Sequence, residues 1–349
     1  MFIEAYDIGP IRPPSEAGSL LIRVNRNCPW NKCEFCMVYK GEKFEMKSVA
    51  EVKSDIDKAA AFFGARAATL DRAFLQDANA LLMKTPDLVE VLHYLNEKFP
   101  GLRRVTTYGR NPTIAKKSVE ELKQLREAGL NRVHVGLETG YGKLLEYVRK
   151  GTTPEEQVEA GRKVKEAGLS LSEYVMPGLG GKEMSREHAL ETARVLNRIN
   201  PDYIRVRSTS VRPDTPLHEK MRRGEFTPLT DVETVEELRL FVESLDGITS
   251  EIVSDHILNL LQEIEGKLPD DKKGMLAAID GFLALPEEEK RLFQVGSRLG
   301  IFRRTDDLRN PFLRARGRQL MDRILKEVAR RGGGFTVEDF IQEALHGMI

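Results

Sequence analysis

The stretch that decides the fold runs from residue 19 to residue 36 and reads SLLIRVNRNCPWNKCEFC. Four of its first six residues, Leu20, Leu21, Ile22 and Val24, are apolar and predict a buried strand, and the polar residues that follow predict a loop. That loop holds all three cysteines of the 349-residue chain, Cys28, Cys33 and Cys36, in a C-x4-C-x2-C pattern. Because an odd number of cysteines cannot close a disulfide framework, the loop points to metal binding or thiol chemistry.

Three neighbouring thiols are compatible with several kinds of site. A structural zinc needs four protein ligands, and the six histidines of the chain are all remote from the loop in sequence. A catalytic thiol would leave two cysteines without a role, and inert buried cysteines do not suit so polar a loop. A four-iron cluster with three thiolates leaves one iron free for an amine and a carboxylate of a small molecule. We favour the cluster, with a zinc module still open as an alternative.

The chain from about residue 19 to residue 210 repeats one unit, a short apolar run followed by a turn and an amphipathic stretch. Capping boxes predict helix starts at Ser48, Ser118 and Thr153, and Thr85 before Pro86 predicts another cap. Strands that alternate with helices predict a parallel sheet, either closed as a barrel or wound on both faces. The predicted strands are residues 19–24, 73–76, 104–107, 132–136, 169–175 and 203–206.

Beyond about residue 213 the pattern changes to a mostly helical one. The sequence therefore predicts three parts: an N-terminal extension (1–18), a βα region (19–215) and a helical C-terminal region (216–349). Asp255 before His256 predicts a helix start, which would place His256 and Asn259 on one face. The predicted C-terminal helices are residues 231–246, 257–265, 271–284, 286–299, 311–331 and 336–346.

Composition narrows the classes of function. Lys plus Arg equal Asp plus Glu at 54 each, so a nucleic-acid-binding protein is not expected, although a local basic patch can hide in the sum. No apolar run is long enough to span a membrane, and the first residues lack the pattern of a secretory signal. We therefore expect a cytoplasmic protein without a membrane span.

Together, these features resemble the radical S-adenosylmethionine (SAM) superfamily. Its members carry three cysteines after the first strand of a partial barrel, usually as C-x3-C-x2-C, with an aromatic residue before the last one. Phe35 stands in that place here, whereas the first gap is one residue longer. The resemblance implies an α/β fold, a partial (βα)6 TIM-like barrel of parallel strands with a mostly helical C-terminal extension. It also implies a [4Fe-4S] cluster on Cys28, Cys33 and Cys36.

The same resemblance implies which residues bind SAM, by position in the branch of tRNA-modifying and coproporphyrin-oxidase-like enzymes. Residues 74–80, FLQDANA, replace the Gly-Gly-Glu stretch after the second strand, and GLETG and MPGLGG follow the fourth and fifth strands. Pro29 is expected to stiffen the turn that absorbs the extra residue of the first gap. The implied cofactor-binding residues are Phe35, Asp77, Asn79, Glu138, Met176 and Arg207.

The resemblance implies an oxygen-sensitive enzyme that cleaves SAM reductively, and the resulting 5′-deoxyadenosyl radical removes a hydrogen atom from a substrate. No catalytic residue is assigned. A flavodoxin or ferredoxin is the expected electron donor, and the expected substrate is a small or lipid-like molecule, because no added RNA-binding domain is visible. The alternatives are a non-enzymatic iron–sulfur or zinc module for redox sensing or electron transfer, and a metal-free hydrolase or aldolase, for which no base and nucleophile pair is apparent.

Overall fold

The computed structural model describes residues 6–346, apart from the side chains of a few residues at its C-terminal end. An eight-stranded sheet in the order β1-β4-β5-β6-β7-β8-β9-β10 forms its centre, and β2 and β3 make a separate antiparallel pair. The strands are β1 (Leu20–Arg23), β2 (Asn25–Arg26), β3 (Glu45–Met46), β4 (Arg72–Gln76), β5 (Arg104–Gly109), β6 (Leu130–Glu138), β7 (Ser170–Val175), β8 (Tyr203–Val206), β9 (Glu251–Val253) and β10 (Gly266–Lys267).

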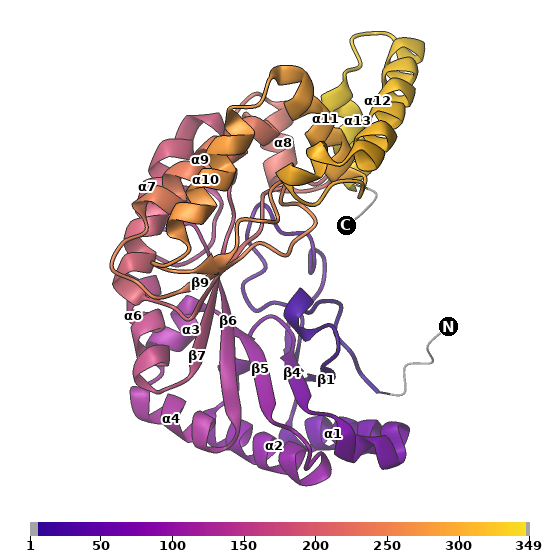
Figure 1. Cartoon of the computed structure of the whole chain (residues 1–349). Helices are drawn as coiled ribbons and strands as arrows, with labels where there is room; N and C mark the ends of the chain where they lie inside the picture. Colours follow the sequence, from indigo (N-terminus) through magenta and orange to yellow (C-terminus); the bar gives the residue numbers. More distant parts are fainter. Residues whose placement is uncertain (1–5, 347–349) are drawn as a thin grey trace.

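Neighbouring strands from β1 to β9 are parallel, and only β10 runs antiparallel to β9. All six predicted strands are present, so the expected α/β class with parallel βα units is confirmed. Figure 1 shows the helices along the outer side of a curved sheet, with the N-terminal segment and the cysteine loop, both indigo, on the inner side. The sheet is therefore a half-closed barrel.

Helices connect the strands and also make up most of the C-terminal region. The α-helices are α1 (Val49–Phe63), α2 (Thr85–Lys98), α3 (Asn111–Lys116), α4 (Val119–Glu127), α5 (Gly142–Tyr147), α6 (Pro154–Glu166), α7 (Gly181–Ile199), α8 (Pro216–Arg222), α9 (Asp231–Ser244), α10 (Lys272–Leu283), α11 (Glu287–Arg298), α12 (Pro311–Arg331) and α13 (Val337–His346). Short 3-10 turns are η1 (Pro14–Glu16), η2 (Gly64–Thr69), η3 (Ala80–Leu82) and η4 (Thr305–Arg309). No described helix is both long and apolar enough to cross a bilayer.

The local signals of the sequence explain most helix ends. The capping boxes at Ser48, Ser118 and Thr153 are all formed, with the side chain and the backbone of each pair bonded reciprocally. The cap predicted at Thr85 is wrong, because Thr85 is already helical. Its hydroxyl donates instead to Glu121 Oε1 at 2.8 Å, a tie between α2 and α4.

The C-terminal region differs from its prediction at residues 251–265. The structure has strand β9 here, paired with β8, and then irregular turns where a helix was expected at 257–265. Asn259 explains the turns, because its side chain donates to Val206 O (2.8 Å) and accepts from Ser208 N (2.8 Å). These bonds fasten the segment to the end of β8.

The N-terminal segment crosses the inner side of the sheet. Near the end of β4, the Gln76 side chain bonds the backbone of Gly9 (3.0 Å) and Ile11 (2.8 Å). Farther along the segment, Glu16 is fully buried and bonds Arg104 at the start of β5. The segment thus runs from the carboxyl end of one strand to the amino end of the next, and it fills part of the open barrel.

Candidate functional site

The cysteine loop leaves the carboxyl end of β1 and returns along β3. All three cysteines are free and half-buried, and Asn31 N donates to Cys28 Sγ at 3.4 Å. The turn in the longer first gap is at Asn31, which has a φ of +46°. Asparagine tolerates this left-handed conformation better than most residues. The expected stiffening of this turn by Pro29 stays a prediction.

Cationic side chains surround the thiols. Lys150 is electrostatically coupled to Cys33 and Cys36, and Arg110 to Cys28 and Cys33. Burial raises the pKa of Cys33 and of Cys36, and the Lys150 ammonium opposes that shift. A positive neighbour stabilises a thiolate, which is the form that binds metal.

The residues present fit an iron–sulfur cluster better than a single metal ion. Among residues 6–346, no three His, Cys, Asp or Glu side chains are grouped closely enough to hold one ion. A four-iron cluster does not need its ligands grouped around one ion, because the three thiolates bind three separate irons. The zinc alternative therefore gains no support from the geometry, whereas three thiols beside two cations suit an anionic cluster.

Glu138 ends strand β6 in a strained conformation beside the cysteine loop. Its φ is +63°, and the β6–β7 register shifts at this point. Lys150 Nζ lies 2.7 Å from Glu138 Oε1. A Cβ at Gly136 would lie 2.2 Å from the same oxygen, so a larger residue there would displace the pair from this position. A left-handed non-glycine residue held in this way is typical of a functional site.

Asp77 lies at the carboxyl end of β4 and is fully buried. Its carboxylate accepts from Arg23 Nε (2.8 Å), Tyr39 OH (3.0 Å) and Asn27 N (3.2 Å). Asn27 precedes the first cysteine and Tyr39 follows the last by three residues, so Asp77 fastens both ends of the cysteine loop. Its expected contact with SAM stays a prediction, and its present partners already occupy the carboxylate.

Asn79 is also buried and already bonded. Its amide donates to Thr113 Oγ1 (2.8 Å), and its carbonyl accepts from Arg110 N (3.2 Å). The Arg110 side chain then donates to Lys150 O at 3.1 Å. Asn79 therefore orients a cation next to the thiols, and a direct contact with SAM stays a prediction.

Phe35 and Met176 meet in one apolar cluster that also contains Val211 and Leu179. Met176 N donates to Glu138 O at 3.0 Å, which joins the loops after β6 and β7.

A buried network that the sequence did not reveal supports these loops. His188 Nε2 lies 3.0 Å from Met176 O, and Glu237 accepts from Gly178 N at 2.7 Å. The sequence offered little indication of this network, because a histidine and a glutamate on amphipathic helices are usually exposed to solvent.

Arg207 follows β8 and is exposed, and among the described residues its guanidinium has no ion pair or hydrogen bond. It is electrostatically coupled to Tyr108 and Tyr174 inside the barrel and to His256 in the loop after β9. Burial and the charge of Arg207 lower the pKa of His256 to about 4, so the imidazole is neutral at pH 7. Within the described residues, the Arg207 guanidinium is therefore a cation without an ion pair at the carboxyl end of β8.

The barrel interior below these residues is aromatic. The rings of Phe74, Tyr108, His134 and Tyr174 form a chain with centroid distances of 5.0 to 6.2 Å. Below them, Glu16 lies 3.5 Å from His134 Nε2. Burial raises the pKa of Glu16, but the hydrogen bond from the Ser19 hydroxyl, the neighbouring His134 and the charge of Arg104 outweigh that effect and lower the pKa to about 2. No local sequence pattern indicates this buried position of Glu16, because Arg104 and His134 are more than 80 residues away from it.

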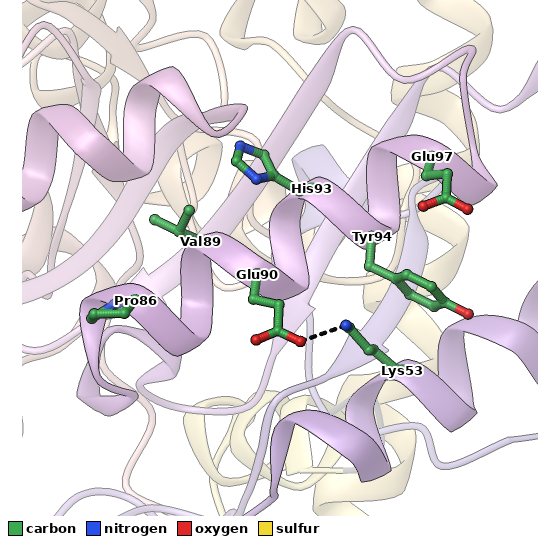
Figure 2. A pocket seen from close by; sticks show the side chains of 7 residues that line it. All are labelled: Lys53, Pro86, Val89, Glu90, His93, Tyr94 and Glu97. Carbon is green, nitrogen blue, oxygen red and sulfur yellow. Dashed lines mark hydrogen bonds and ion pairs between the residues drawn. The ribbon is translucent and has the colours of Figure 1, made fainter.

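A separate pocket lies on the outer helices α1 and α2 (Figure 2). Lys53 pairs there with Glu90 at 2.5 Å, beside Tyr94 and His93. It includes none of the predicted site residues, so we place the functional site at the barrel mouth.

Comparison with known proteins gives one family match. The family described as "Radical SAM superfamily" matches residues 22–196, half of the chain. A tRNA uridine(34) acetyltransferase of Methanocaldococcus jannaschii is 30% identical over 118 residues, 34% of this chain and 22% of that protein. A tRNA-2-methylthio-N(6)-dimethylallyladenosine synthase of Prosthecochloris aestuarii is 25% identical over 287 residues, 77% of this chain and 60% of that protein.

Among solved structures, coproporphyrinogen III oxidase (HemN) from Escherichia coli aligns with a TM-score of 0.48 and 15% identity. The alignment covers 65% of this chain and 52% of that one. In each of these matches the chain spans less than two thirds of the relative's own length.

Proposed function

Because this chain belongs to the radical SAM superfamily, we propose that it is an enzyme with one [4Fe-4S] cluster, held by Cys28, Cys33 and Cys36. The chemistry that such a cluster supplies is one-electron cleavage of SAM to methionine and a 5′-deoxyadenosyl radical. Such a radical would take a hydrogen atom from a substrate bound at the barrel mouth. The observation that carries the proposal is the placement of three free thiols next to Lys150, Arg110 and the strained Glu138.

The residues around the loop have separate proposed roles. Lys150 and Arg110 stabilise the thiolates by charge. Glu138, pinned by Lys150, offers a carboxylate to the amine or the ribose hydroxyls of SAM, and the apolar cluster of Phe35 and Met176 receives the adenine. Arg207 pairs with an anionic group of SAM or of the substrate. Asp77 and Asn79 are proposed to contribute mainly through the loop and the cation that they orient.

The electron donor and the substrate are further parts of the proposal. A flavodoxin or ferredoxin in a reducing cytoplasm supplies the electron, and the substrate expected from the sequence is small or lipid-like. The aromatic lining of the barrel favours a substrate that is at least partly apolar or planar.

Anaerobic purification and reconstitution test the function. We expect about four irons per chain and release of 5′-deoxyadenosine from SAM on addition of dithionite. Cys28→Ala is the matched negative control, and its iron content and deoxyadenosine release should both fall to background. One bound zinc without SAM cleavage would contradict the proposal and restore the non-enzymatic alternative.

A further inference from the structure

The C-terminal region contains a strongly basic segment. Residues 303–331 hold ten Lys or Arg and four Asp or Glu, an excess of six positive charges in a chain whose total charge is zero. Most of this segment is helix α12. The neutral total therefore conceals a local concentration of charge.

Helix α12 separates apolar and basic residues onto two faces. Its apolar face is packed, since Leu320, Ile324 and Val328 lie in one cluster with Leu258 and Val295. The opposite face carries residues that recur at three- and four-residue spacing, which aligns them along one side of a helix. This face, called the basic face below, consists of Phe312, Arg316, Gln319, Arg323 and Lys326, all exposed.

The cations of the basic face lack acidic partners. Within the described part of the chain, Arg316, Arg323 and Lys326 form no ion pair, whereas Arg314 pairs with Glu289 and Arg330 with Glu327. One unpaired acid, Asp322, lies beside them. Surface charges gain little from pairing, but three unpaired cations in a row produce a positive field that attracts a polyanion.

An aromatic ring lies at one end of this row. Phe312 is 68% exposed, and the Arg316 guanidinium lies 5.9 Å from its ring centroid. Exposed aromatic and guanidinium planes next to a basic track are the elements on which single-stranded bases stack. From Arg316 to Lys326 the helix rises about 15 Å, enough to follow several phosphates.

The basic face is anchored to the loop that borders the barrel mouth. Ile324 of α12 packs with Leu258, and the next residue, Asn259, bonds both Val206 and Ser208, which flank Arg207. In Figure 1, α12 stands clear of the barrel with one side uncovered. A polymer bound on α12 would therefore lie next to the opening of the barrel.

We propose that the basic face binds a single-stranded polynucleotide, with Arg316, Arg323 and Lys326 on successive phosphates and Phe312 stacked on a base. A membrane surface fits less well, because a helix that binds a bilayer inserts its apolar face, and that face of α12 is packed against α11 and the loop at Leu258. A polynucleotide partner differs from the small or lipid-like substrate that the sequence led us to expect. The inference does not depend on radical chemistry, since binding is measurable without SAM.

Fluorescence anisotropy of the full chain with an end-labelled, mixed-sequence single-stranded RNA of about 20 nucleotides tests the proposal at several salt concentrations. The variant R316A/R323A/K326A should bind about tenfold more weakly. Its slope of log Kd against log salt should fall by about 2, since each phosphate contact on a single strand contributes about 0.7. The control R66A/R72A/K84A removes three exposed cations far from α12 and should bind like the parent protein.

Phe312→Ala separates stacking from charge. It should weaken binding about fivefold or more and leave the salt slope unchanged, because it removes a stacking surface and no cation. A DNA strand of the same sequence that binds equally well supports the shared polynucleotide chemistry. Equal affinities of the two triple variants would overturn the proposal. So would binding of vesicles of anionic and neutral phospholipid, lost in the α12 triple variant, without any binding of RNA.

Discussion

Replacing Asp77 by asparagine removes the buried charge that fastens both ends of the cysteine loop. The carboxylate is fully buried and bonds Arg23, Tyr39 and Asn27. Loss of one partner of a buried ion pair costs about 3–5 kcal/mol. Because Arg23 keeps Asp7 as a partner at 3.0 Å and asparagine has nearly the same shape, we expect a loss of about 3 kcal/mol in the free energy of unfolding.

Urea unfolding of the cluster-free protein, followed by circular dichroism, measures this loss. A second assay measures how much iron stays bound after reconstitution and gel filtration. Asp77→Asn should lower both quantities, because the loop that carries the thiols loses its anchor. Tyr39→Phe removes one hydrogen bond from the same carboxylate and should cost about 1 kcal/mol, with a smaller loss of iron.

Asp57→Asn is the matched control, since Asp57 is an exposed aspartate of α1 that also bonds a tyrosine hydroxyl. It should change unfolding by less than about 0.5 kcal/mol. The reasoning is refuted if Asp77→Asn unfolds like Asp57→Asn. It is refuted equally if Asp77→Asn keeps its stability and its iron but loses affinity for SAM, because Asp77 would then act as a SAM ligand and not as an anchor.

Three other perturbations test separate parts of the structure. Cys28→Ala should retain its far-ultraviolet circular dichroism but bind almost no iron, and wild-type iron content would contradict the ligand assignment. Gly136→Ala should displace the Glu138 carboxylate, which lies 2.2 Å from the added Cβ, and weaken SAM binding measured by calorimetry; unchanged affinity would remove Glu138 from the site. Glu16 has a pKa lowered to about 2, so its stabilising effect is complete above its unfolded pKa near 4.5 and is lost as pH falls towards 2. Urea midpoints of the parent protein and Glu16→Gln should therefore differ at pH 6 and converge near pH 2, and a constant difference would contradict the lowered pKa.

The sequence predicts the βα region well because its signals are local. Apolar runs and capping boxes each act within a few residues, and all six strands were found at nearly the expected positions. Strand β9 was missed because three residues carry too little pattern, and it exists through pairing with β8. The helix predicted at 257–265 is wrong, and the irregular segment there is fastened to the end of β8 by the Asn259 side chain, a long-range contact that a local pattern does not contain.

In the candidate site, too, the sequence predicts what depends on neighbouring residues and misses what depends on distant ones. The three cysteines are adjacent in sequence, so their grouping needed no structure. The role of Asp77 depends on partners 38 to 54 residues away, and Glu16 bonds Arg104 at a distance of 88 residues in sequence, which no local pattern contains. The basic face of α12 is visible in the sequence only when helix geometry shows which cations share a side and which are paired.

Electron paramagnetic resonance of the dithionite-reduced, reconstituted protein tests the central claim most directly. If three thiolates hold a four-iron cluster with one open iron, the reduced protein should give a [4Fe-4S]⁺ signal whose g-values change when SAM is added. A protein without such a signal, or with one that SAM leaves unchanged, would contradict the account.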